Sequence, residues 1–384
     1  MAVQRISPRP GVRTAFLLAA VILIAVFQLA GARLARADEG RGFVQTNLVS
    51  DLPNVARVQD ANLKNPWGIA HGPTTPWWVA DNNGNVSTLY DGAGNPFPVG
   101  SPLVVNIPAP GATTGGTPTG IVFNGQAADF AVTDGKTSGS SLFIFGTEDG
   151  TIVGWSPTMN RTQAFIAVDN SQVPDAADGA VYKGLALAQT ERGQMLYAAN
   201  FRAGTVDVFD STFKQIRRDG AFTDRKIPAG FAPFGIQAVG DRILVTYAKQ
   251  DADRHDDVSG PGNGFVDVFS TGGRLLRRLV EQGHLNSPWG LAVAPDGFGR
   301  FEGDLLVGNF GDGRINAYDP RSGEFEGTLR QPDGQPIQID DLWGIAFGNG
   351  GNAGPKGTLF FAAGINDEAD GLFGSIVPAG ERDD

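Results

Sequence analysis

Short apolar runs separated by glycine-containing turns repeat along the chain between residues 66 and 345. Each repeat opens on a glycine that begins an apolar run. The six openings are Pro66-Trp67-Gly68-Ile69, Pro118-Thr119-Gly120-Ile121, Tyr182-Lys183-Gly184-Leu185, Pro233-Phe234-Gly235-Ile236, Pro288-Trp289-Gly290-Leu291 and Leu342-Trp343-Gly344-Ile345. The glycines are 52, 64, 51, 55 and 54 residues apart. A period near that of propeller blades predicts a ring of small sheets, each stabilised by its neighbours.

The fifth repeat illustrates how one such sheet is built. Residues 289–293 form a short apolar run, residues 304–309 form a second, and residues 313–319 form a third in which apolar and polar positions alternate. Runs of this length, rich in β-branched and aromatic residues, predict strands rather than helices. A fourth, more polar strand is expected to follow in every repeat. The pattern therefore predicts an all-β fold, a six-bladed β-propeller.

Two features that recur in the repeats have structural explanations. The glycine lies on the innermost strand, where close approach near the central axis leaves little room for a side chain. Aromatic residues that end the third strands are expected to pack one sheet on the next; they are Tyr90, Trp155, Phe209, Phe269, Tyr318 and Phe373. The residue before the glycine is bulky in four repeats, but Thr119 and Lys183 break this pattern, and Lys183 is the notable exception because it is a cation. Near the channel mouth, this cation must be solvated or paired with an acid.

The two ends of the repeat region predict how the ring closes. After the third strand of the sixth repeat, residues 371–377, only residues 378–384 remain, which is too little for a paired outer strand. The segment Phe43–Val49 precedes the first repeat and has the composition of a strand. We therefore expect the N-terminal strand to complete the last blade and remove its open edge.

The motifs quoted above also resemble known families. The sequence Pro66-Trp67-Gly68-Ile69-Ala70, followed by Val79-Ala80-Asp81, resembles NHL-type six-bladed propellers and, more loosely, the gluconolactonase and senescence-marker-protein lactonases. Residues 47–53 together with 65–70 are similar to an uncharacterised family of exported bacterial proteins, some of which carry a PEP-CTERM sorting tail. This resemblance spans most of residues 43–377 and implies the fold but no activity. The chain ends at residues 379–384 without an apolar helix, so surface retention through such a tail is not expected.

The first 37 residues have the character of an export signal. Arg5, Arg9 and Arg13 precede an apolar stretch from Ala15 to about Ala30, and Ala35-Arg36-Ala37 offers small residues around a cleavage point after Ala37. The alternative is an uncleaved membrane anchor, because the apolar run approaches the length of a spanning helix. We expect a signal peptide over 1–37, one propeller domain over 38–377, a short tail over 378–384, and a secreted or periplasmic location.

Charge and cysteine content exclude several classes of function. The net charge is -11, and removal of residues 1–37 would make it more negative, because that segment contains five arginines and no acid. Such a surface repels phosphate backbones, so nucleic acid is not an expected partner. The chain has no cysteine, which excludes disulfides, thiolate catalysis and lipid attachment through Cys. No membrane association is expected after signal cleavage, and a monomer is expected.

Polar residues are expected to gather on one face of the ring. In a propeller, the loops that lead into the innermost strands and the turns between second and third strands emerge around the channel mouth. The polar residues in these segments are Asn65, Asp81, Asn82, Thr147, Glu148, Asp149, Lys183, Asn200, Asn309, Asp312, Asp340, Asp341, Asn366, Asp367 and Glu368. Carboxylate and amide oxygens are the ligands that calcium selects. Asp and Asn are equally common in turns for reasons of backbone geometry alone.

The resemblance to the lactonases suggests a specific metal site. Those relatives hold their metal with a Glu, an Asn and an Asp from separate blades. Asp81, Asn200 and Asn309 fall at comparable strand ends and are the candidate calcium ligands. No Glu matches the first blade, where Asn62 or Asn65 stands instead, and this departure weakens the transfer of a lactonase activity. Residues 366–371 faintly resemble the first half of a calcium loop but lack its closing Glu.

The longest interruption lies in the fourth repeat, between its second and third strands. Residues 249–264 are charged and rich in glycine, so they form either a functional lid or a disordered insertion. His255 lies among five carboxylates, which should raise its pKa and make it a poor neutral metal ligand. Because this loop should overhang the channel face, Lys183, Asp341 and His255 are the candidate ligand-binding residues.

Motifs for nucleophilic or dinucleotide chemistry are missing from the sequence. The segment Gly139-Ser140-Ser141 lacks the nucleophile-elbow pattern, and no glycine-rich turn follows a strand and opens a helix. We therefore expect an exported scaffold that binds an extracellular protein or a small ligand at its channel face. The alternative is a calcium-dependent lactonase or related hydrolase, so the residues leave open whether the protein is an enzyme.

Overall fold

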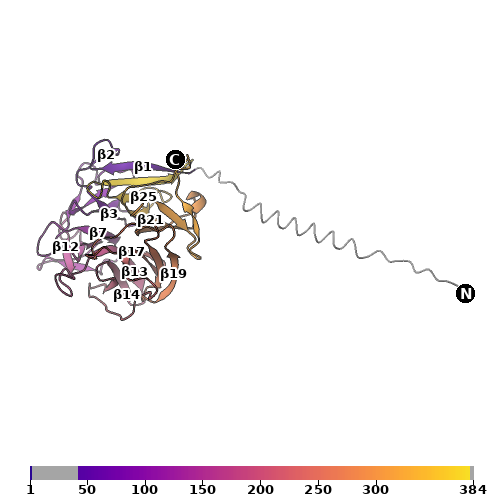
Figure 1. Cartoon of the computed structure of the whole chain (residues 1–384). Helices are drawn as coiled ribbons and strands as arrows, with labels where there is room; N and C mark the ends of the chain where they lie inside the picture. Colours follow the sequence, from indigo (N-terminus) through magenta and orange to yellow (C-terminus); the bar gives the residue numbers. More distant parts are fainter. Residues whose placement is uncertain (2–41, 381–384) are drawn as a thin grey trace. The chain divides into compact units, whose positions relative to one another are not determined.

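The computed structural model describes Met1 and residues 42–380, and Figure 1 draws the whole chain. The predicted signal peptide and the last four residues of the predicted tail thus lie outside the described residues, Met1 excepted. Within residues 42–380 the fold is all-β, and its one helix is the short 3-10 turn η1 (Gly299–Phe301). No helix in this part of the chain is long and apolar enough to cross a bilayer.

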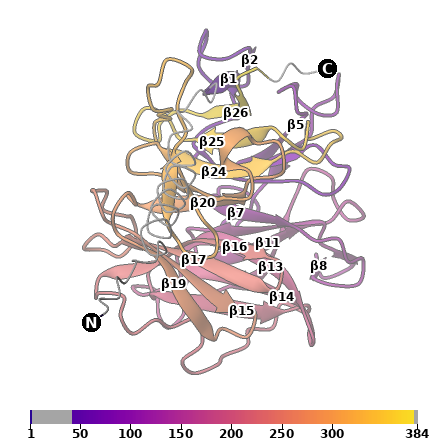
Figure 2. The ribbon, with the colours of Figure 1, turned by 90° about the vertical axis from the view of Figure 1, so that its right-hand side faces the viewer.

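Six sheets form the blades of the propeller (Figure 2). The first five are antiparallel and have their innermost strand first in sequence, whereas the sixth adds two strands from the start of the described chain, which pair with each other in parallel. Blade one contains β3 (Pro66–Ala70), β4 (Trp77–Asp81), β5 (Val86–Tyr90) and β6 (Val104–Asn106), and blade two contains β7 (Pro118–Phe123), β10 (Phe143–Thr147), β11 (Thr151–Trp155) and β12 (Phe165–Asp169). Blade three contains β13 (Tyr182–Thr190), β14 (Gly193–Asn200) and β15 (Thr205–Asp210), and blade four contains β16 (Phe231–Val239), β17 (Arg242–Lys249), β18 (Phe265–Ser270) and β19 (Leu275–Glu281).

Blade five contains β20 (Pro288–Val293), β21 (Leu305–Asn309), β22 (Ile315–Tyr318) and β23 (Phe325–Thr328). Blade six contains β24 (Leu342–Phe347), β25 (Leu359–Ala363), β26 (Leu372–Pro378), β1 (Phe43–Ser50) and β2 (Val58–Gln59). A small separate hairpin, β8 (Ala131–Thr133) with β9 (Ser138–Ser140), lies in the connection between β7 and β10. The six-bladed propeller predicted from the repeat is confirmed.

The N-terminal strand closes blade six, as the sequence predicts. β1 pairs antiparallel with β26 from Phe43 opposite Pro378 to Ser50 opposite Leu372, with one irregularity near Asn47. Figure 2 shows the two strands side by side, although they come from opposite ends of the described chain. The innermost strands complete the ring, because β24 contacts β3 just as each innermost strand contacts the next.

The repeated glycines are required by the close approach of neighbouring blades. A Cβ added at Gly235 would lie 2.0 Å from the carbonyl oxygen of Trp289, and one added at Gly344 would lie 2.6 Å from that of Trp67. All six glycines meet the backbone of the next innermost strand in this way. The channel between these strands narrows to a cavity of about 50 Å³, so the centre of the ring is a packed core rather than an open pore.

Aromatic residues pack between blades, with one correction to the sequence-based expectation. Trp78 of blade one contacts Trp155 of blade two, with ring centroids 4.5 Å apart, and Tyr90 of blade one stacks on Phe373 of blade six at 5.7 Å. Phe373 does not end its strand as expected; it is the second residue of β26. β26 continues to Pro378 because β1 pairs with it along its whole length.

Blade three departs from the expected four strands. Its sheet has only β13, β14 and β15, and residues 211–230 follow β15 as turns and irregular backbone. This segment makes a single isolated bridge to the sheet, between Phe209 and Gln215. It contains Asp219-Gly220 and Pro228-Ala229-Gly230, which favour turns over a continuous strand. The expectation of a fourth strand in every repeat is therefore wrong for blade three.

Candidate functional site

The channel is closed near one end by aromatic side chains that precede the innermost glycines. Trp67 and Trp343 stack with centroids 3.4 Å apart and planes 16° from parallel, and Trp289 meets both rings edge-on. Phe234 completes the layer against Trp343. These side chains are buried, so they form a floor beneath the channel mouth rather than an exposed stacking surface.

Lys183 lies on this floor and is the buried cation at the mouth. It precedes Gly184 on β13, and 1% of its side chain is exposed. Its Nζ atom lies 4.8 Å from the ring centroid of Trp67, 2.5 Å from Glu148 Oε1 and 3.1 Å from Asp256 Oδ1. Burial alone would lower the pKa of Lys183, but the two carboxylates outweigh it and raise the pKa above its ordinary value. Lys183 is therefore paired rather than solvated.

Glu148 is held from two sides at the turn between β10 and β11. Its Oε1 atom accepts from Lys183, and its Oε2 atom accepts from Asn82 Nδ2 at 2.8 Å. The loop before β7 holds this turn in place, because Asp149 Oδ2 accepts hydrogen bonds from both the amide and the hydroxyl of Thr117. This arrangement places the carboxyl group of Glu148 directly against the buried ammonium group of Lys183.

The long loop of blade four reaches the same point. Gln250 Nε2 donates to the carbonyl of Phe201 at 2.6 Å, Arg254 pairs with Asp178 of the loop before β13, and Gly260 N donates to Asn286 Oδ1 before β20. The loop is thus tied to the segments on both sides of it. The disordered-insertion alternative for residues 249–264 is therefore wrong, because these bonds to blades three and five give the loop a fixed path.

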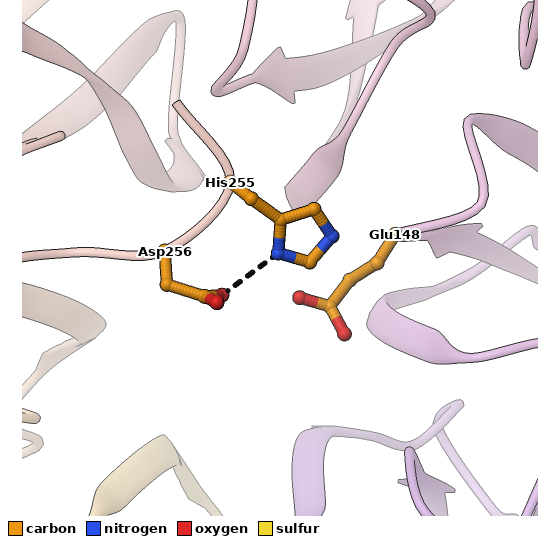
Figure 3. Close-up of side chains that lie close together, drawn as sticks. All are labelled: Glu148, His255 and Asp256. Carbon is orange, nitrogen blue, oxygen red and sulfur yellow. Dashed lines mark hydrogen bonds and ion pairs between the residues drawn. The ribbon is translucent and has the colours of Figure 1, made fainter. Parts of the chain in front are cut away.

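His255 and Asp256 are the residues that this loop brings to the mouth. His255 Nδ1 and Asp256 Oδ1 are 3.0 Å apart, and Glu148 lies opposite them (Figure 3). The hydrogen bond to Asp256 raises the pKa of His255, as the sequence predicts. The same bond, with the charge of Lys183, holds the pKa of Asp256 well below its usual range. His255 is therefore a cation over more of the neutral range than a free histidine.

Two further carboxyl groups near the mouth have raised pKa values. Burial and the negative charge of Glu148 raise the pKa of Glu368 to about 7, and burial and the charge of Asp340 raise the pKa of Asp341 to about 6. The Oε1 atom of Glu368 is buried and has no hydrogen-bond partner among residues 42–380. Neighbouring carboxyl groups contribute to the raised pKa of both residues. The mouth therefore carries more negative charge than its cations balance.

The turn that carries Glu368 has a strained backbone. Residues Asn366, Asp367 and Glu368 have φ values of 63°, 53° and 63°, in the left-handed region that non-glycine residues avoid. The strain is offset by local bonds, including Asn366 Nδ2 to Asp370 Oδ2 at 2.9 Å and Glu368 N to the carbonyl of Gly364 at 2.8 Å. Strain of this kind collects at ligand-binding segments, where it fixes a side chain in place before the ligand arrives.

The side chains of Glu148, His255 and Asp256 offer ligand atoms within 4.8 Å of one another, which is close enough to share a metal ion. The ammonium of Lys183 already lies against both carboxylates, however, and supplies the positive charge that a metal would bring. A protonated His255 offers no lone pair at Nδ1. The geometry therefore fits an ion-paired binding site better than a metal centre formed by these three residues.

The predicted calcium ligands are each engaged within their own blade. Asp81 Oδ2 accepts from the amide and hydroxyl of Thr88, and burial raises the pKa of Asp81 well above its ordinary value. Asn200 Nδ2 donates to Asp207. Asn309 Nδ2 donates to the carbonyl of His284 and to Asp312. The Oδ1 atoms of Asp81 and Asn309 are buried without a hydrogen-bond partner among the described residues.

The predicted ligand-binding residues Lys183 and His255 both bond to Asp256. The third, Asp341, bonds to neither of them among residues 42–380, and burial and neighbouring acids raise its pKa. The role of Asp256 was not predicted from the sequence, nor was the bond from Asn82 to Glu148. The one available signal was Lys183 itself, because a cation at an otherwise aromatic or small position requires an acid nearby.

Sequence comparison finds relatives of similar length. No protein-family model matches the chain. The uncharacterised protein R648 of Acanthamoeba polyphaga mimivirus is 35% identical over 338 residues, which cover 86% of this chain and 78% of R648. The uncharacterised protein L690 of the same virus is 32% identical over 341 residues, which cover 86% of this chain and 84% of L690. Both are viral, so neither supports the exported bacterial family that the sequence resembles.

Structural comparison supports the fold alone. The soluble aldose sugar dehydrogenase of Escherichia coli, in its apo-form, superposes with a TM-score of 0.53 and 14% identity over 88% of this chain and 99% of its own. A streptogramin B lyase superposes with a TM-score of 0.50 and 12% identity over 88% of this chain and 99% of its own. At such low identity, neither activity transfers to this chain.

Proposed function

This chain belongs to the protein family that includes the mimivirus proteins R648 and L690, and we propose that it is an exported binding protein whose channel mouth holds a small cationic ligand. The ligand carries an ammonium group or is a divalent cation. It approaches past the blade-four lid, residues 249–264, and meets the carboxyls of Glu368 and Asp341.

The excess of carboxyl groups at the mouth is the observation that carries this proposal. Lys183 is paired with Glu148 and Asp256, and no lysine or arginine is paired with Glu368 or Asp341 among residues 42–380. Burial and the repulsion of neighbouring acids raise the pKa of Glu368 to about 7 and that of Asp341 to about 6. A cation placed between them would relieve that repulsion, and the unpartnered Oε1 of Glu368 would gain a partner.

Perturbed carboxyls in a sheltered, prearranged site are typical of binding and catalytic sites. The left-handed turn at residues 366–368 supports the same assignment, because it holds Glu368 in a costly backbone conformation. The aromatic floor below Lys183 is closed, so the ligand is small and remains at the mouth rather than passing through the ring.

Export, a monomeric state and an extracellular ligand or protein partner belong to this proposal. Arginines, an apolar stretch and the Ala35-Arg36-Ala37 triplet in residues 1–37 support a cleaved signal peptide. The propeller has no cysteine and depends on core burial, which suits either side of a membrane. Membership of an exported bacterial family with occasional sorting tails is supported by the resemblance of residues 47–70 alone.

Calorimetric titration and thermal melting of the mature protein test the cationic ligand. Calcium chloride and 1,4-diaminobutane serve as probes, with a chelator as the blank, at about pH 5.5 and about pH 8. At least one probe should raise the melting temperature at the higher pH, because ligand that binds only the folded state stabilises it by about 2.7 kcal/mol at 100 times its Kd. The effect should shrink at the lower pH, where Glu368 and Asp341 are protonated.

Variants locate the effect. The double variant E368Q/D341N should lose it, whereas E326Q, which removes an exposed carboxylate on β23, should keep it. If both cations leave the melting temperature of the unaltered protein unchanged at the higher pH, the proposal is wrong.

A calcium-dependent hydrolase is the second candidate function. The observation that favours it is the pair of buried, unpartnered oxygens, Asp81 Oδ1 and Asn309 Oδ1, at the ends of β4 and β21. Calcium bound by Asp81, Asn200 and Asn309 would be lost in N309A and retained in E368Q/D341N. The same titrations therefore separate this site from the one at Glu368.

A further inference from the structure

The outer edge of blade three is open where each of the other five blades carries a fourth strand. β6 pairs with residues Val86–Thr88 at the start of β5, and β12, β19 and β23 pair with the third strands of blades two, four and five. β15 of blade three pairs only with β14. Within the described part of the chain, no strand lies along the start of β15, residues Thr205–Asp207.

Blade one shows how a fourth strand would continue, because the chain leaves the third strand in the same way in blades one and three. After β5, Phe97 N donates to the carbonyl of Leu89, and Tyr90 bridges to Pro96. After β15, Ile216 N donates to the carbonyl of Val208, and Phe209 bridges to Gln215. In blade one the chain then returns as β6, whereas in blade three it does not.

The backbone of β15 has hydrogen-bonding groups that face this open edge. The carbonyl of Val208 points away from β14, since it accepts from Ile216. Because successive residues of a strand alternate in direction, the amide and carbonyl of Val206 point the same way. No hydrogen bond to either group is found among residues 42–380. Such a row of unpaired groups is a template for another strand.

A groove lies along this edge and has room for a peptide. Its volume is about 880 Å³. One wall is β15, and the other is formed by residues 215–223. The turns at residues 189–192 and 270–272 also line the groove, as do Asn170, Val173, Pro174 and Ala180 of the loop before β13. We call this the blade-three groove. Val206, Ile216 and Ala221 are only partly buried and pack on the core between blades three and four, so the groove has an apolar base beneath its polar rim.

Blade six provides the precedent within the same molecule. Its fourth strand, β1, comes from the opposite end of the described chain and pairs along β26. The ring therefore already completes one blade with a strand that is remote in sequence. Blade three also lacks a fourth strand from its own repeat, and no remote strand supplies one within residues 42–380.

We propose that the blade-three groove binds an extended peptide segment of a partner protein, which adds to β15 as the fourth strand of the blade. The peptide runs antiparallel to β15 and exchanges backbone hydrogen bonds with Val206, as β6 pairs with Val86–Thr88 in blade one. Its residue opposite Val206 is apolar, because the corresponding residue of β6, Val105 opposite Ser87, is fully buried. Main-chain bonds supply the affinity, and the alternate side chains supply the specificity.

A labelled peptide tests this site directly. The probe is acetyl-Thr-Val-Thr-Val-Thr-Val-Thr-amide carrying fluorescein, and the control is the same sequence with every amide N-methylated. Fluorescence anisotropy should show saturable binding of the first peptide and at least a roughly tenfold weaker affinity for the second, which has no backbone donors. Hydrogen exchange should show new protection at residues 205–208 when the first peptide is bound.

Two substitutions of one residue identify the contact. V206P removes the amide that faces the groove and is compatible with an edge strand, whereas V206T keeps the amide and the branched shape. The affinity for the peptide should fall roughly tenfold in V206P and change little in V206T. The melting temperatures of the two variants report whether both remain folded, and exchange protection in the unaltered protein provides the same answer without any substitution.

Several results would overturn the proposal. They are failure of the unmodified peptide to bind, equal binding of the N-methylated peptide, or protection at a place other than residues 205–208. If the unaltered protein elutes as a dimer and V206P as a monomer, a second copy of the chain occupies the edge, and the partner-peptide proposal is wrong.

Discussion

Lys183 shows how a single residue can change the character of a propeller mouth. In four of six blades, the position before the innermost glycine carries Trp or Phe, and these side chains fill the channel. Lys183 lies over one of those rings while its ammonium binds two carboxylates. Its charge is buried at a cost that only the paired acids offset. Lys183 therefore places a positive charge on an otherwise apolar layer of side chains, and acidic residues gather around that charge.

Removal of Lys183 should destabilise the protein through the acids that it leaves behind. In K183M, Glu148 stays largely buried without a cation, so we expect a loss of about 3 kcal/mol in the free energy of unfolding, near the lower end for a broken buried pair, because Asp256 can turn to water. The double variant K183M/E148Q should recover part of that loss. Urea denaturation followed by tryptophan fluorescence measures both. Equal stability of K183M and the unaltered protein would contradict a role for the pair in the fold.

Glu368 should make stability depend on pH in a definite direction. Its pKa is about 7 in the folded protein and 4.5 in the unfolded chain, so the folded state holds the proton more tightly. The resulting stabilisation is complete below about pH 4.5 and is lost as the pH rises to about 7. The variant E368Q lacks this loss, and its stability relative to the unaltered protein should rise by about 1 to 3 kcal/mol across that range. Thermal melts at half-unit pH steps measure the difference, and a difference that stays flat with pH would refute the assignment.

At the scale of the elements, the sequence predicts what depends on local pattern. The six glycines, the innermost strands and the closing segment Phe43–Val49 are all visible as short motifs, and the structure confirms them. The pair between Lys183 and Asp256 is not visible, because 73 residues separate them and the loop's path is set by bonds to Phe201 and Asn286. The missing strand of blade three escaped prediction because the repeat predicts a fourth strand in every blade, although Asp219-Gly220 and Pro228-Ala229-Gly230 favour turns there.

Deletion of residues 38–50 should destabilise the whole propeller, not only blade six. The deletion removes β1, whose Phe43, Leu48 and Val49 are buried, and exposes the edge of β26. Burial of three such side chains contributes roughly 5 kcal/mol or more. We expect a large fall in the melting temperature, partly restored when a synthetic peptide of residues 42–51 is added. A truncated protein that melts like the full chain would show that β1 does not close the ring.

At the scale of the whole molecule, the propeller depends on six close approaches that support one another. Each innermost glycine contacts the backbone of the next blade, and the last contact returns to blade one. A blade cannot move outward without breaking contacts on both sides, so the ring is expected to unfold as one unit. The channel mouth should be equally rigid, because Lys183, Glu148 and Glu368 belong to three different blades whose positions are fixed by the ring.

Substitution of one glycine in the ring should therefore affect the whole structure. In G235A the added Cβ would lie 2.0 Å from the carbonyl oxygen of Trp289, which is backbone and has no alternative rotamer. The two blades must separate, at a cost of about 3 kcal/mol, the upper part of the range for an overpacked core. G357A is the matched control, because a Cβ at Gly357 meets nothing within 4 Å and its φ is not positive. Calorimetric melts should show a single transition, lowered in G235A and unchanged or slightly raised in G357A. If G235A melts in two separate transitions, or at the temperature of the unaltered protein, the ring does not behave as one cooperative unit.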